Sequence, residues 1–414
     1  MPNFSIPLSG LQAASQTLSV ISNNLANLNT VGYKASQASF RDLFYQSFGT
    51  NGANDPIQVG EGVAINSVTP IFTDGNLQST GVNTDAAITG SGFFVSQKDG
   101  VLGFTRAGNF TVNDSGQLTT QDGQLVMGYP AVNGVISPTQ TLAPLQVNQG
   151  QLIPGNQTTT IQTQTNLDAS AKVGDSFSTP ITVFDALGTS HVLTYQFTKT
   201  AANAWNYQIT IPAADTGGTG ASVVVSSGAL TFNGNGTLAT PAAPVTGITI
   251  AGLADGATVP LNLTWNLQDA NGNSLITQTA SPSATANTLQ DGFGSGTLLD
   301  FNIASDGTIE GAFSNSQTLA LGQIVLANFA NPQGLNRVGQ NSYQTTLASG
   351  APVIGVAGTG GRGTITGSSL EQSNVDIATE FANMIVTQRG YQANARVVTT
   401  FDQLTQDTIN MKQL

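Results

Sequence analysis

The first stretch of the chain carries one apolar stripe at helical spacing. From Leu11 onward, apolar side chains recur every three or four residues, as in the contact seam of a coiled coil. This spacing predicts an amphipathic helix over residues 5–28, about 36 Å long at 1.5 Å per residue, with Ser5 as its N-cap. The residues assigned to this seam are Leu11, Leu18, Ile21, Leu25 and Leu28.

The last stretch carries a second, longer stripe. Ser369 and Gln372 have the spacing of a capping box, and Asn374 is another candidate N-cap. The apolar positions that follow keep steps of three, four or seven residues to the C-terminus, which predicts a helix of about forty residues, roughly 60 Å long. The residues assigned to this seam are Ile377, Phe381, Met384, Tyr391, Val398 and Leu404.

Two arrangements of these helices are open. The helices either pair as a hairpin within one chain, or neighbouring copies cover both stripes. The stripes lie at the two ends of the chain, and the long middle offers no third helical stripe as a partner. We therefore expect other copies, rather than each other, to cover the seams, in a homo-oligomer that forms a helical polymer.

Between the ends, polar and apolar positions alternate as they do in β-strands. Four short segments have the composition of hairpin turns, because glycine supplies the positive φ that tight turns need. They are Asp99-Gly100, Asp114-Ser115-Gly116, Asp122-Gly123 and Asp306-Gly307. We expect residues 73–360 to be all-β, and shifts in composition near residues 148 and 290 predict a second β-domain inserted into the first.

The expected fold class is mainly β and multidomain, with a terminal α-helical coiled-coil region and discontinuous, nested domains. Four parts are predicted: inner terminal helices in 1–35 and 368–414, a connecting segment at 36–72, a middle β-domain from 73–147 and 292–367, and an outer inserted β-domain at 148–291. Glycine-rich stretches at 49–56 and 358–363 are expected to act as flexible joints.

Composition narrows the classes of function. Charged residues make up 8% of the chain and its net charge is −12, so nucleic acid and anionic membranes are not expected as partners. The chain has no cysteine and one histidine, His191, which excludes thiolate sites and argues against histidine metal clusters. A basic n-region does not precede an apolar stretch near the N-terminus, and no apolar run reaches ~20 residues, so neither a cleaved signal peptide nor a membrane span is expected.

Three motifs that suggest chemistry fail in their context. Residues 358–363 match GxGxxG, but no βαβ unit surrounds them. Residues 269–280 begin like an EF-hand loop, but they lack its central glycine and final glutamate. Asp185, Ser190 and His191 are the residue types of a hydrolase triad, yet the last two are adjacent in an alternating strand and point to opposite faces. We expect His191 on the surface or on a sheet face, and we expect no catalytic residue, metal or cofactor, and hence no enzyme.

Both ends and two internal stretches carry motifs that occur together in one known family. The stretches are Ser9 to Lys34, Asp85 to Phe94, Thr105 to Phe110 and Ser373 to Asn394. In this order they resemble the axial proteins of the bacterial flagellum, the family of rod, hook and hook-associated proteins. The family-signature residues are Asn23, Asn24, Asn27, Gly32, Tyr33, Asn374, Gln388, Arg389 and Asn394.

The resemblance implies a structural subunit that polymerises around an export channel, with its terminal helices innermost. The outer insertion favours the hook branch, a curved universal joint that transmits motor torque from rod to filament, over the distal rod branch, which is the alternative. Implied partners are a distal rod protein, the hook–filament junction (hook-associated) protein, a hook cap protein and the flagellar type III export gate. The implied location is the extracellular hook on the basal body, reached without a cleaved signal peptide, and Phe4 and Leu8 match a short pattern proposed for engaging the gate.

Overall fold

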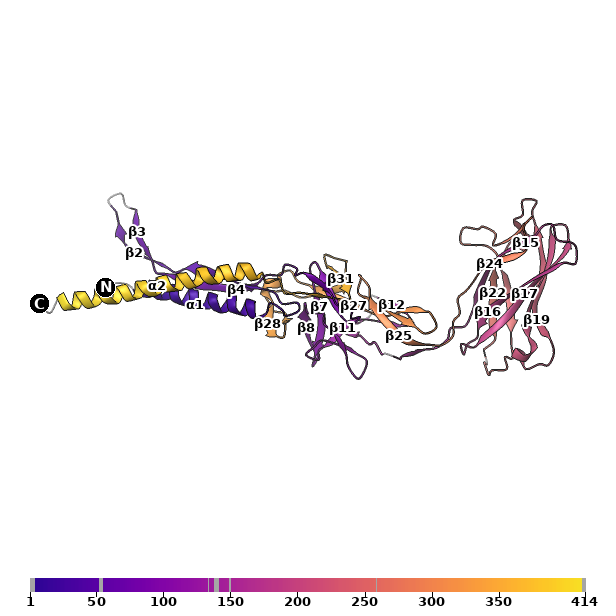
Figure 1. Ribbon diagram of the computed structural model, residues 1–414, viewed down its shortest axis with the longest axis horizontal. Helices are drawn as coiled ribbons and strands as arrows, with labels where there is room; N and C mark the ends of the chain where they lie inside the picture. Colours follow the sequence, from indigo (N-terminus) through magenta and orange to yellow (C-terminus); the bar gives the residue numbers. More distant parts are fainter. Residues whose placement is uncertain are drawn as a thin grey trace. The chain divides into compact units, whose positions relative to one another are not determined.

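The structure is a computed structural model that describes residues 4–51, 55–132, 134–137, 141–148, 150–257 and 259–411. The chain forms two units. Unit 1 comprises Met1–Asn148, Phe301–Gly311 and Leu319–Leu414, and unit 2 comprises Gln149–Asp300 and Ala312–Thr318. Strands and two terminal helices make up these units (Figure 1), which confirms the predicted fold class. The boundaries of the four predicted parts stay a prediction.

Unit 1 contains both long helices and many short strands. The helices are α1 (Ser5–Ala26) and α2 (Ile377–Met411). The strands from the N-terminal side are β1 (Ser36–Asp42), β2 (Tyr45–Thr50), β3 (Pro56–Gly60), β4 (Val63–Pro70), β5 (Leu77–Ser79), β6 (Ala86–Thr89), β7 (Phe93–Lys98), β8 (Val101–Thr105), β9 (Thr111–Val112), β10 (Leu118–Thr119), β11 (Leu125–Val132), β12 (Val135–Ile136) and β13 (Ala143–Pro144). Those from the C-terminal side are β28 (Asn336–Gly339), β29 (Ser342–Gln344), β30 (Val353–Val356), β31 (Thr364–Gly367) and β32 (Ser369–Glu371), with a 3-10 turn η2 (Pro332–Gly334). The unit boundaries fall within β25 (Gly296–Ile303), β26 (Thr308–Phe313) and β27 (Thr318–Asn328).

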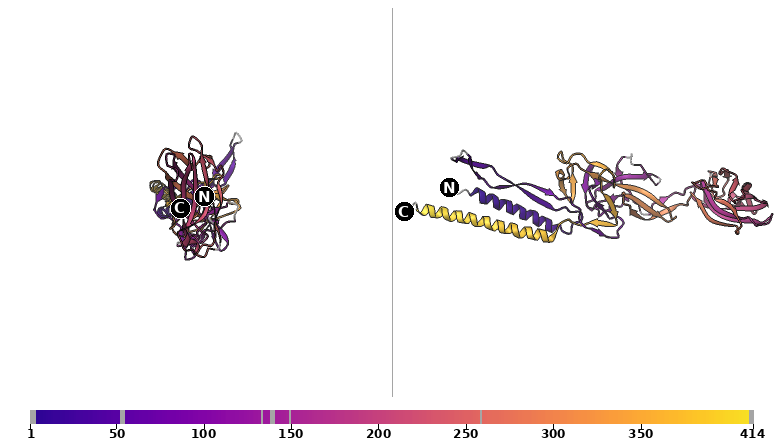
Figure 2. Two further views of the ribbon diagram at one scale, coloured as in Figure 1. Left: turned by 90° about the vertical axis from the view of Figure 1, so that its right-hand side faces the viewer. Right: turned by 90° about the horizontal axis from the view of Figure 1, so that it is seen from above.

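The two helices pack against each other within the chain (Figures 1 and 2). A Cβ placed on Gly10 would lie 2.7 Å from Nδ2 of Asn394, so glycine lets the two backbones approach closely at this level. Near the N-terminal end of α1, the rings of Phe4 and Phe401 meet edge to face with centroids 6.0 Å apart. The expectation that the two seams would not cover each other is therefore wrong: one side of each helix is covered within the chain.

Both helix starts differ from the prediction. Ser5 is the first helical residue, and Phe4 occupies the N-cap position without a capping side-chain hydrogen bond. Ser369 lies in β32, which pairs with β5, so the capping-box spacing belongs to a strand. The residue that caps α2 is Asp376, whose Oδ1 accepts the Thr379 N–H at 2.7 Å.

Neither glycine-rich stretch is a joint between a helix and a β-domain. Residues 49–51, 55 and 56 belong to the hairpin in which β2 pairs antiparallel with β3. The stretch 358–363 is a hydrogen-bonded turn between β30 and β31, where the Gly358 N–H donates to the Gly363 carbonyl at 2.8 Å and the Arg362 N–H to the Thr359 carbonyl at 3.0 Å. Backbone hydrogen bonds, which composition does not reveal, hold the turn at 358–363 and the described residues of 49–56, while residues 52–54 lie outside the described part of the chain.

Around its β-strands, unit 1 has its own apolar core. The strands pair in the order β27-β11-β7-β8-β29-β28. The core side chains are Phe93, Val95, Phe104, Met127, Val325, Ala327, Phe329, Leu335 and Tyr343. The predicted Asp99-Gly100 turn is confirmed: Lys98 pairs with Val101, and both turn residues have positive φ, 50° and 80°.

Unit 2 is a sandwich of two sheets. One sheet runs β16 (Ser176–Phe184), β17 (Ser190–Ala201), β18 (Ala204–Pro212), β19 (Ser222–Phe232) and β20 (Leu238–Thr240) in sequence order. The other contains β21 (Val245–Ile250), β22 (Leu261–Asn266), β15 (Thr160–Asp168) and β23 (Ile276–Thr279) in that order, with β24 (Ala284–Gln290) also paired to β15. β14 (Leu152–Ile153) and a 3-10 turn η1 (Ala213–Thr216) complete the unit.

Strands in which buried and outward-facing side chains alternate form the core of unit 2. Along β17 and β18 every second side chain is buried, as expected for strands with one face turned inward. From the opposite sheet, Trp265 packs edge-on against Tyr195 and Tyr207, with ring centroids 5.1 and 5.3 Å apart. Such a core is complete within unit 2. Among the described residues, no helix combines the length and apolar character needed to cross a bilayer.

The hydroxyl of Tyr195 allows a test of this core. It is buried and makes no hydrogen bond in the structure, and burial raises the pKa of Tyr195. Removing an unsatisfied hydroxyl relieves a desolvation cost, so we expect Tyr195→Phe to raise the free energy of unfolding by about 1 kcal/mol. Both tryptophans lie in unit 2, so their fluorescence during urea unfolding of the full chain reports on this unit.

The matched control is Thr163→Val. The buried Thr163 hydroxyl accepts the Trp265 Nε1–H at 3.0 Å, so removing it should lower the free energy of unfolding by about 1–3 kcal/mol. A loss of stability in Tyr195→Phe as large as in the control would contradict this account.

Candidate functional site

A buried polar junction joins the end of α1, the segment before α2 and the neighbouring strands of unit 1. Asn24 lies at its centre and is 1% exposed. Its Nδ2 donates to the Ser36 carbonyl and to Oε1 of Glu380, each at 2.9 Å, and its Oδ1 accepts the Ser36 N–H at 2.9 Å. Only an amide side chain both donates and accepts in this way. Asn24 therefore links α1, β1 and the first turn of α2.

The residues after α1 complete this side of the junction. Tyr33 donates its hydroxyl to Oδ1 of Asn23 at 2.8 Å, and Oδ1 of Asn27 accepts from the Thr30 hydroxyl at 3.1 Å. Gly32 has a φ of 66°, and a Cβ there would lie 2.6 Å from the Arg106 carbonyl carbon. Glycine is therefore required at this position by both conformation and space.

Asn374 closes the junction from the C-terminal side. Its Oδ1 accepts the Ala35 N–H at 2.8 Å. Its Nδ2 donates to the carbonyls of Ile71 and Thr73 at 2.9 and 3.1 Å. Asn24 and Asn374 thus supply hydrogen bonds to backbone groups where segments from the two ends of the chain meet. Asn374 is therefore not a helix cap.

A buried ion network lies beside these asparagines. Lys34 Nζ is 2.7 Å from Oε1 of Glu371, and these side chains are 1% and 0% exposed. Arg106 Nη1 is 3.5 Å from Oε2 of Glu371 and 3.4 Å from Oδ1 of Asp74. Burial, and the nearby Arg106 charge, lower the pKa of Lys34, while Glu371 acts in the opposite direction. Glu371 is the buried counterion of both cations, and Asp74, whose side chain is 41% exposed, adds a second negative charge from the surface.

Sequence reasoning missed this network as a site. Lys34 and Arg106 lie in the stretches that carry the family resemblance, but Glu371 and Asp74 lie outside them. A signal was available, because charges are rare in this chain and each charged residue among apolar neighbours is a candidate for a buried pair.

The other predicted residues lie outside the junction. Of the α1 seam, Ile21 is buried and Leu11, Leu18, Leu25 and Leu28 are half-buried. On α2, Met384 and Val398 are half-buried, whereas Ile377, Phe381, Tyr391 and Leu404 are exposed. Gln388 and Arg389 are exposed on α2, Asn394 faces Gly10, and Leu8 is exposed near the start of α1. Their roles in polymerisation and export stay predictions.

The residues weighed as a hydrolase triad lie in unit 2. Ser190 is exposed and His191 is buried, so the two side chains point to opposite faces as expected, and the triad does not form. His191 is 5% exposed and lies on the inner face of β17 among three aspartates, so of the two expected placements it has the one on a sheet face and not the one on the surface. Of the residues weighed as a triad, Asp185 and His191 lie near each other, with Asp185 Oδ2 3.6 Å from His191 Nε2.

Comparisons with known proteins match four stretches of the chain to family models and align nearly its whole length with relatives. Residues 6–34 match the flagella basal body rod protein profile, 87–172 the flagellar hook protein FlgE/F/G D1 domain, 155–293 the flagellar basal body protein FlaE D2 domain and 366–411 the flagellar basal body rod FlgEFG protein C-terminal profile. The chain is 36% identical to the flagellar hook protein FlgE of Escherichia coli K12 over 99% of this chain and 100% of the relative. It is 34% identical to that of Treponema pallidum over 98% of both chains.

A solved structure agrees at the level of the fold. The crystal structure of Helicobacter pylori flagellar hook protein FlgE2 superposes with a TM-score of 0.55 at 16% identity, covering 71% of this chain and 100% of that one.

One substitution that removes a charge from the ion network should strongly lower the stability of unit 1. Glu371→Gln removes the carboxylate that Lys34 and Arg106 share, and it leaves buried positive charge without its partner. We expect a loss of about 3–5 kcal/mol in the stability of unit 1, measured by urea unfolding followed at 222 nm, where α1 and α2 dominate the signal. Glu310→Gln, on the partly exposed face of β26, is the control and should change stability by less than about 0.5 kcal/mol. Equal effects of the two substitutions would refute a structural role for the network.

The stability of the first turn of α2 should depend on pH through its capping residue. The Thr379 N–H, which donates to Asp376, holds the pKa of Asp376 below its usual value. Because the pKa of Asp376 is lower in the folded state, the cap contributes its full stabilisation of the helix above the unfolded pKa of about 3.9. Its contribution is lost as the pH falls through the folded value. We expect amide exchange at Thr379 to accelerate in this acid range, and Asp376→Ala to remove that step; an unchanged step in the variant would disprove the assignment.

Proposed function

The chain belongs to the flagellar hook protein FlgE family and is a structural subunit of the bacterial flagellar hook, and from this premise we propose how it assembles and works. Its terminal helices form the inner layer of a curved helical tube that encloses the export channel. The tube acts as a universal joint and transmits motor torque from rod to filament. In this arrangement the innermost layer comprises residues 1–35 and 368–414, and residues 36–72 connect it to the middle layer. The middle layer comprises residues 73–147 and 292–367, and residues 148–291 lie outermost.

The apolar surface that remains on α2 is the observation that supports assembly through the helices. Along its 35 residues no side chain is buried, although α1 packs against it. The exposed apolar side chains are Ile377, Phe381, Ile385, Val386, Tyr391, Val397, Leu404, Ile409 and Met411. Full burial of one such side chain contributes about 1.5–3 kcal/mol, so surrounding α2 with neighbouring copies provides a strong driving force.

These side chains occupy more than one face of α2. Ile377, Phe381 and Ile385 follow one another at steps of four residues, on one flank of the helix. Val397 and Leu404 are seven residues apart and lie on a different side. A helix with apolar groups on several sides fits a site with several neighbours. A helical polymer supplies such a site, whereas an isolated hairpin covers only one face.

Torque and bending place different demands on the subunit. Slippage between helices would expose apolar side chains, so the inner layer resists twisting. The exterior strand faces of unit 2 carry mostly hydroxyl and amide side chains and few charges, and contacts between such groups are weak and interchangeable. Neighbouring copies of unit 2 therefore slide past one another as the tube bends. Sliding replaces the glycine joints in this mechanism, since residues 358–363 form a hydrogen-bonded turn and the described residues of 49–56 belong to the β2–β3 hairpin.

Family membership also supports a set of partners. We place a distal rod protein below the tube, the hook–filament junction (hook-associated) protein above it and a hook cap protein at the growing end. Export through the flagellar type III gate, without a cleaved signal peptide, would bring the chain to the outside. Phe4 contacts Phe401 in the folded chain, so Phe4 and Leu8 would engage the gate before the helices pair.

The polymerisation seam is tested by an exposed residue of α2. Leu404 is 52% exposed, so Leu404→Asp should leave the folded subunit intact while placing a charge in the proposed interface. We expect negative-stain electron microscopy of concentrated protein to show tubes for the unaltered chain and none for Leu404→Asp. Gln403→Asp, a change to the same charge at the adjacent exposed position, should still polymerise. Normal tubes from Leu404→Asp, or equal loss in both variants, would contradict the proposed seam.

A further inference from the structure

Three aspartates surround the chain's one histidine at an end of the unit 2 sandwich. Asp185 follows β16, His191 lies near the start of β17, Asp215 lies in η1, and Asp255 lies in the loop between β21 and β22. The side chains of Asp185 and His191 are 0% and 5% exposed. Four separate segments of the sequence therefore each bring one ionisable side chain to this end of the sandwich.

One nitrogen of His191 is oriented by a carboxylate. Nδ1 lies 3.1 Å from Oδ2 of Asp215. A carboxylate only accepts hydrogen bonds, so Nδ1 carries the proton and donates it to Asp215. Nε2 is then left with its lone pair in the neutral ring. This is the arrangement in which a carboxylate fixes the tautomer of a metal-binding histidine.

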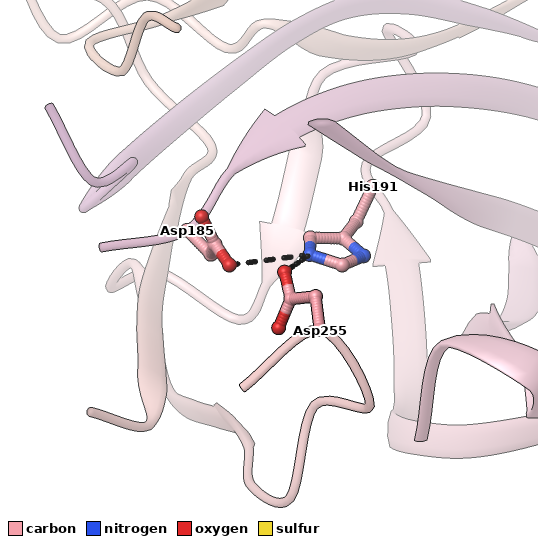
Figure 3. A group of neighbouring side chains, drawn as sticks. All are labelled: Asp185, His191 and Asp255. Atoms are coloured by element: carbon pink, nitrogen blue, oxygen red, sulfur yellow. Dashed lines mark ion pairs between the residues drawn. The ribbon is translucent and has the colours of Figure 1, made fainter. Parts of the chain in front are cut away.

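The other nitrogen faces two carboxylates. Nε2 lies 3.6 Å from Oδ2 of Asp185 and 3.4 Å from Oδ2 of Asp255, and Figure 3 shows both oxygens directed at this one nitrogen. Neither Nε2 nor Oδ2 of Asp185 has a hydrogen-bond partner, and both atoms are buried. Two of these three electron-rich atoms are shielded from water, and their convergence is unfavourable unless a positive charge lies between them.

The spacing of the three atoms fits a metal ion. Around a tetrahedral centre with bonds of about 2.0–2.1 Å, neighbouring ligand atoms lie about 3.3 Å apart. The two separations from Nε2 are close to that value, and the three ligand atoms lie within 4.8 Å of one another. Small shifts of these side chains would complete the geometry.

The backbone holds the first ligand in place. Oδ1 of Asp185 accepts the N–H groups of Leu187 and Thr189 at 2.9 and 2.7 Å. These hydrogen bonds leave Oδ2 directed into the cluster. Asp255 and Asp215 are 21% and 28% exposed, so an ion can enter from their side and keep a water as its fourth ligand.

We propose that Asp185, His191 and Asp255 bind a divalent transition-metal ion of the zinc class, with Asp215 as the positioning residue for the imidazole. Two carboxylates neutralise a divalent ion, and an imidazole ligand favours this class over magnesium or calcium. The bound ion would tie the β16–β17 turn to the loop before β22. The site is therefore structural, and it does not depend on polymerisation.

Zinc binding to the full chain in its monomeric state tests this proposal. The protein should carry no polyhistidine tag, so that His191 is its one imidazole, and it should first be freed of metal by a chelator. We expect calorimetry at pH 7 to show one equivalent of Zn²⁺. At a hundredfold excess over Kd, the melting temperature followed by tryptophan fluorescence should rise by about 5–10 °C. The NMR signals of the single imidazole should shift with the same stoichiometry.

Two variants and a control identify the ligands. His191→Gln and Asp255→Asn should each abolish the zinc-dependent rise in melting temperature. Asp255 lies in a loop and is partly exposed, so its variant keeps the test usable if the buried substitution prevents folding. Asp269→Asn, in a turn of unit 2 outside the cluster, should keep the full zinc response.

Other results would overturn the assignment. Absence of zinc binding, with His191 protonated at pH 7, would mean that an imidazolium provides the positive charge. Zinc binding that survives in both ligand variants would be adventitious. A response lost in His191→Gln but retained in Asp255→Asn would exclude the three-ligand site.

Discussion

The buried pair of Lys34 and Glu371 is the interaction on which the architecture of unit 1 depends. Lys34 follows the first helix and Glu371 precedes the second, so their contact joins residues from opposite ends of the chain. A charge pair without access to water stabilises only when hydrogen bonds and countercharges surround it. Arg106, the Thr73 carbonyl and the Gly75 N–H supply these. Asn24 and Asn374 then fasten both helices to the strands beside the pair.

The junction explains how one chain presents two helices together and still leaves them available for assembly. Pairing begins where the polar network holds the ends, and close approach at Gly10 and Asn394 continues it along the helices. Only one side of α2 is used in this contact. The remaining apolar side chains are exposed in the single subunit, which suits a hook protein whose inner helices meet their other neighbours only in the polymer.

Unit 2 has a different basis for its stability. Its two sheets enclose aromatic and aliphatic side chains from both faces, and its core needs no contribution from another copy. Its outer strand faces are poor in charge, which favours weak lateral contacts. Against that background the group of Asp185, His191, Asp215 and Asp255 is unusual, because it brings four ionisable side chains together at one end of the sandwich.

Local patterns in the sequence determined the two helices, the hairpin turns and the alternation of the strands, because spacing along the chain dictates which side chains share a face. Motifs at the two ends and in two internal stretches indicated the family. Tertiary structure alone decided that α1 packs on α2, that Asp376 rather than Ser369 or Asn374 caps α2, and that residues 358–363 form a hydrogen-bonded turn. It also brought Lys34 to Glu371 and His191 to three aspartates. These contacts join residues far apart in sequence, and no periodicity encodes which distant partner a side chain will meet.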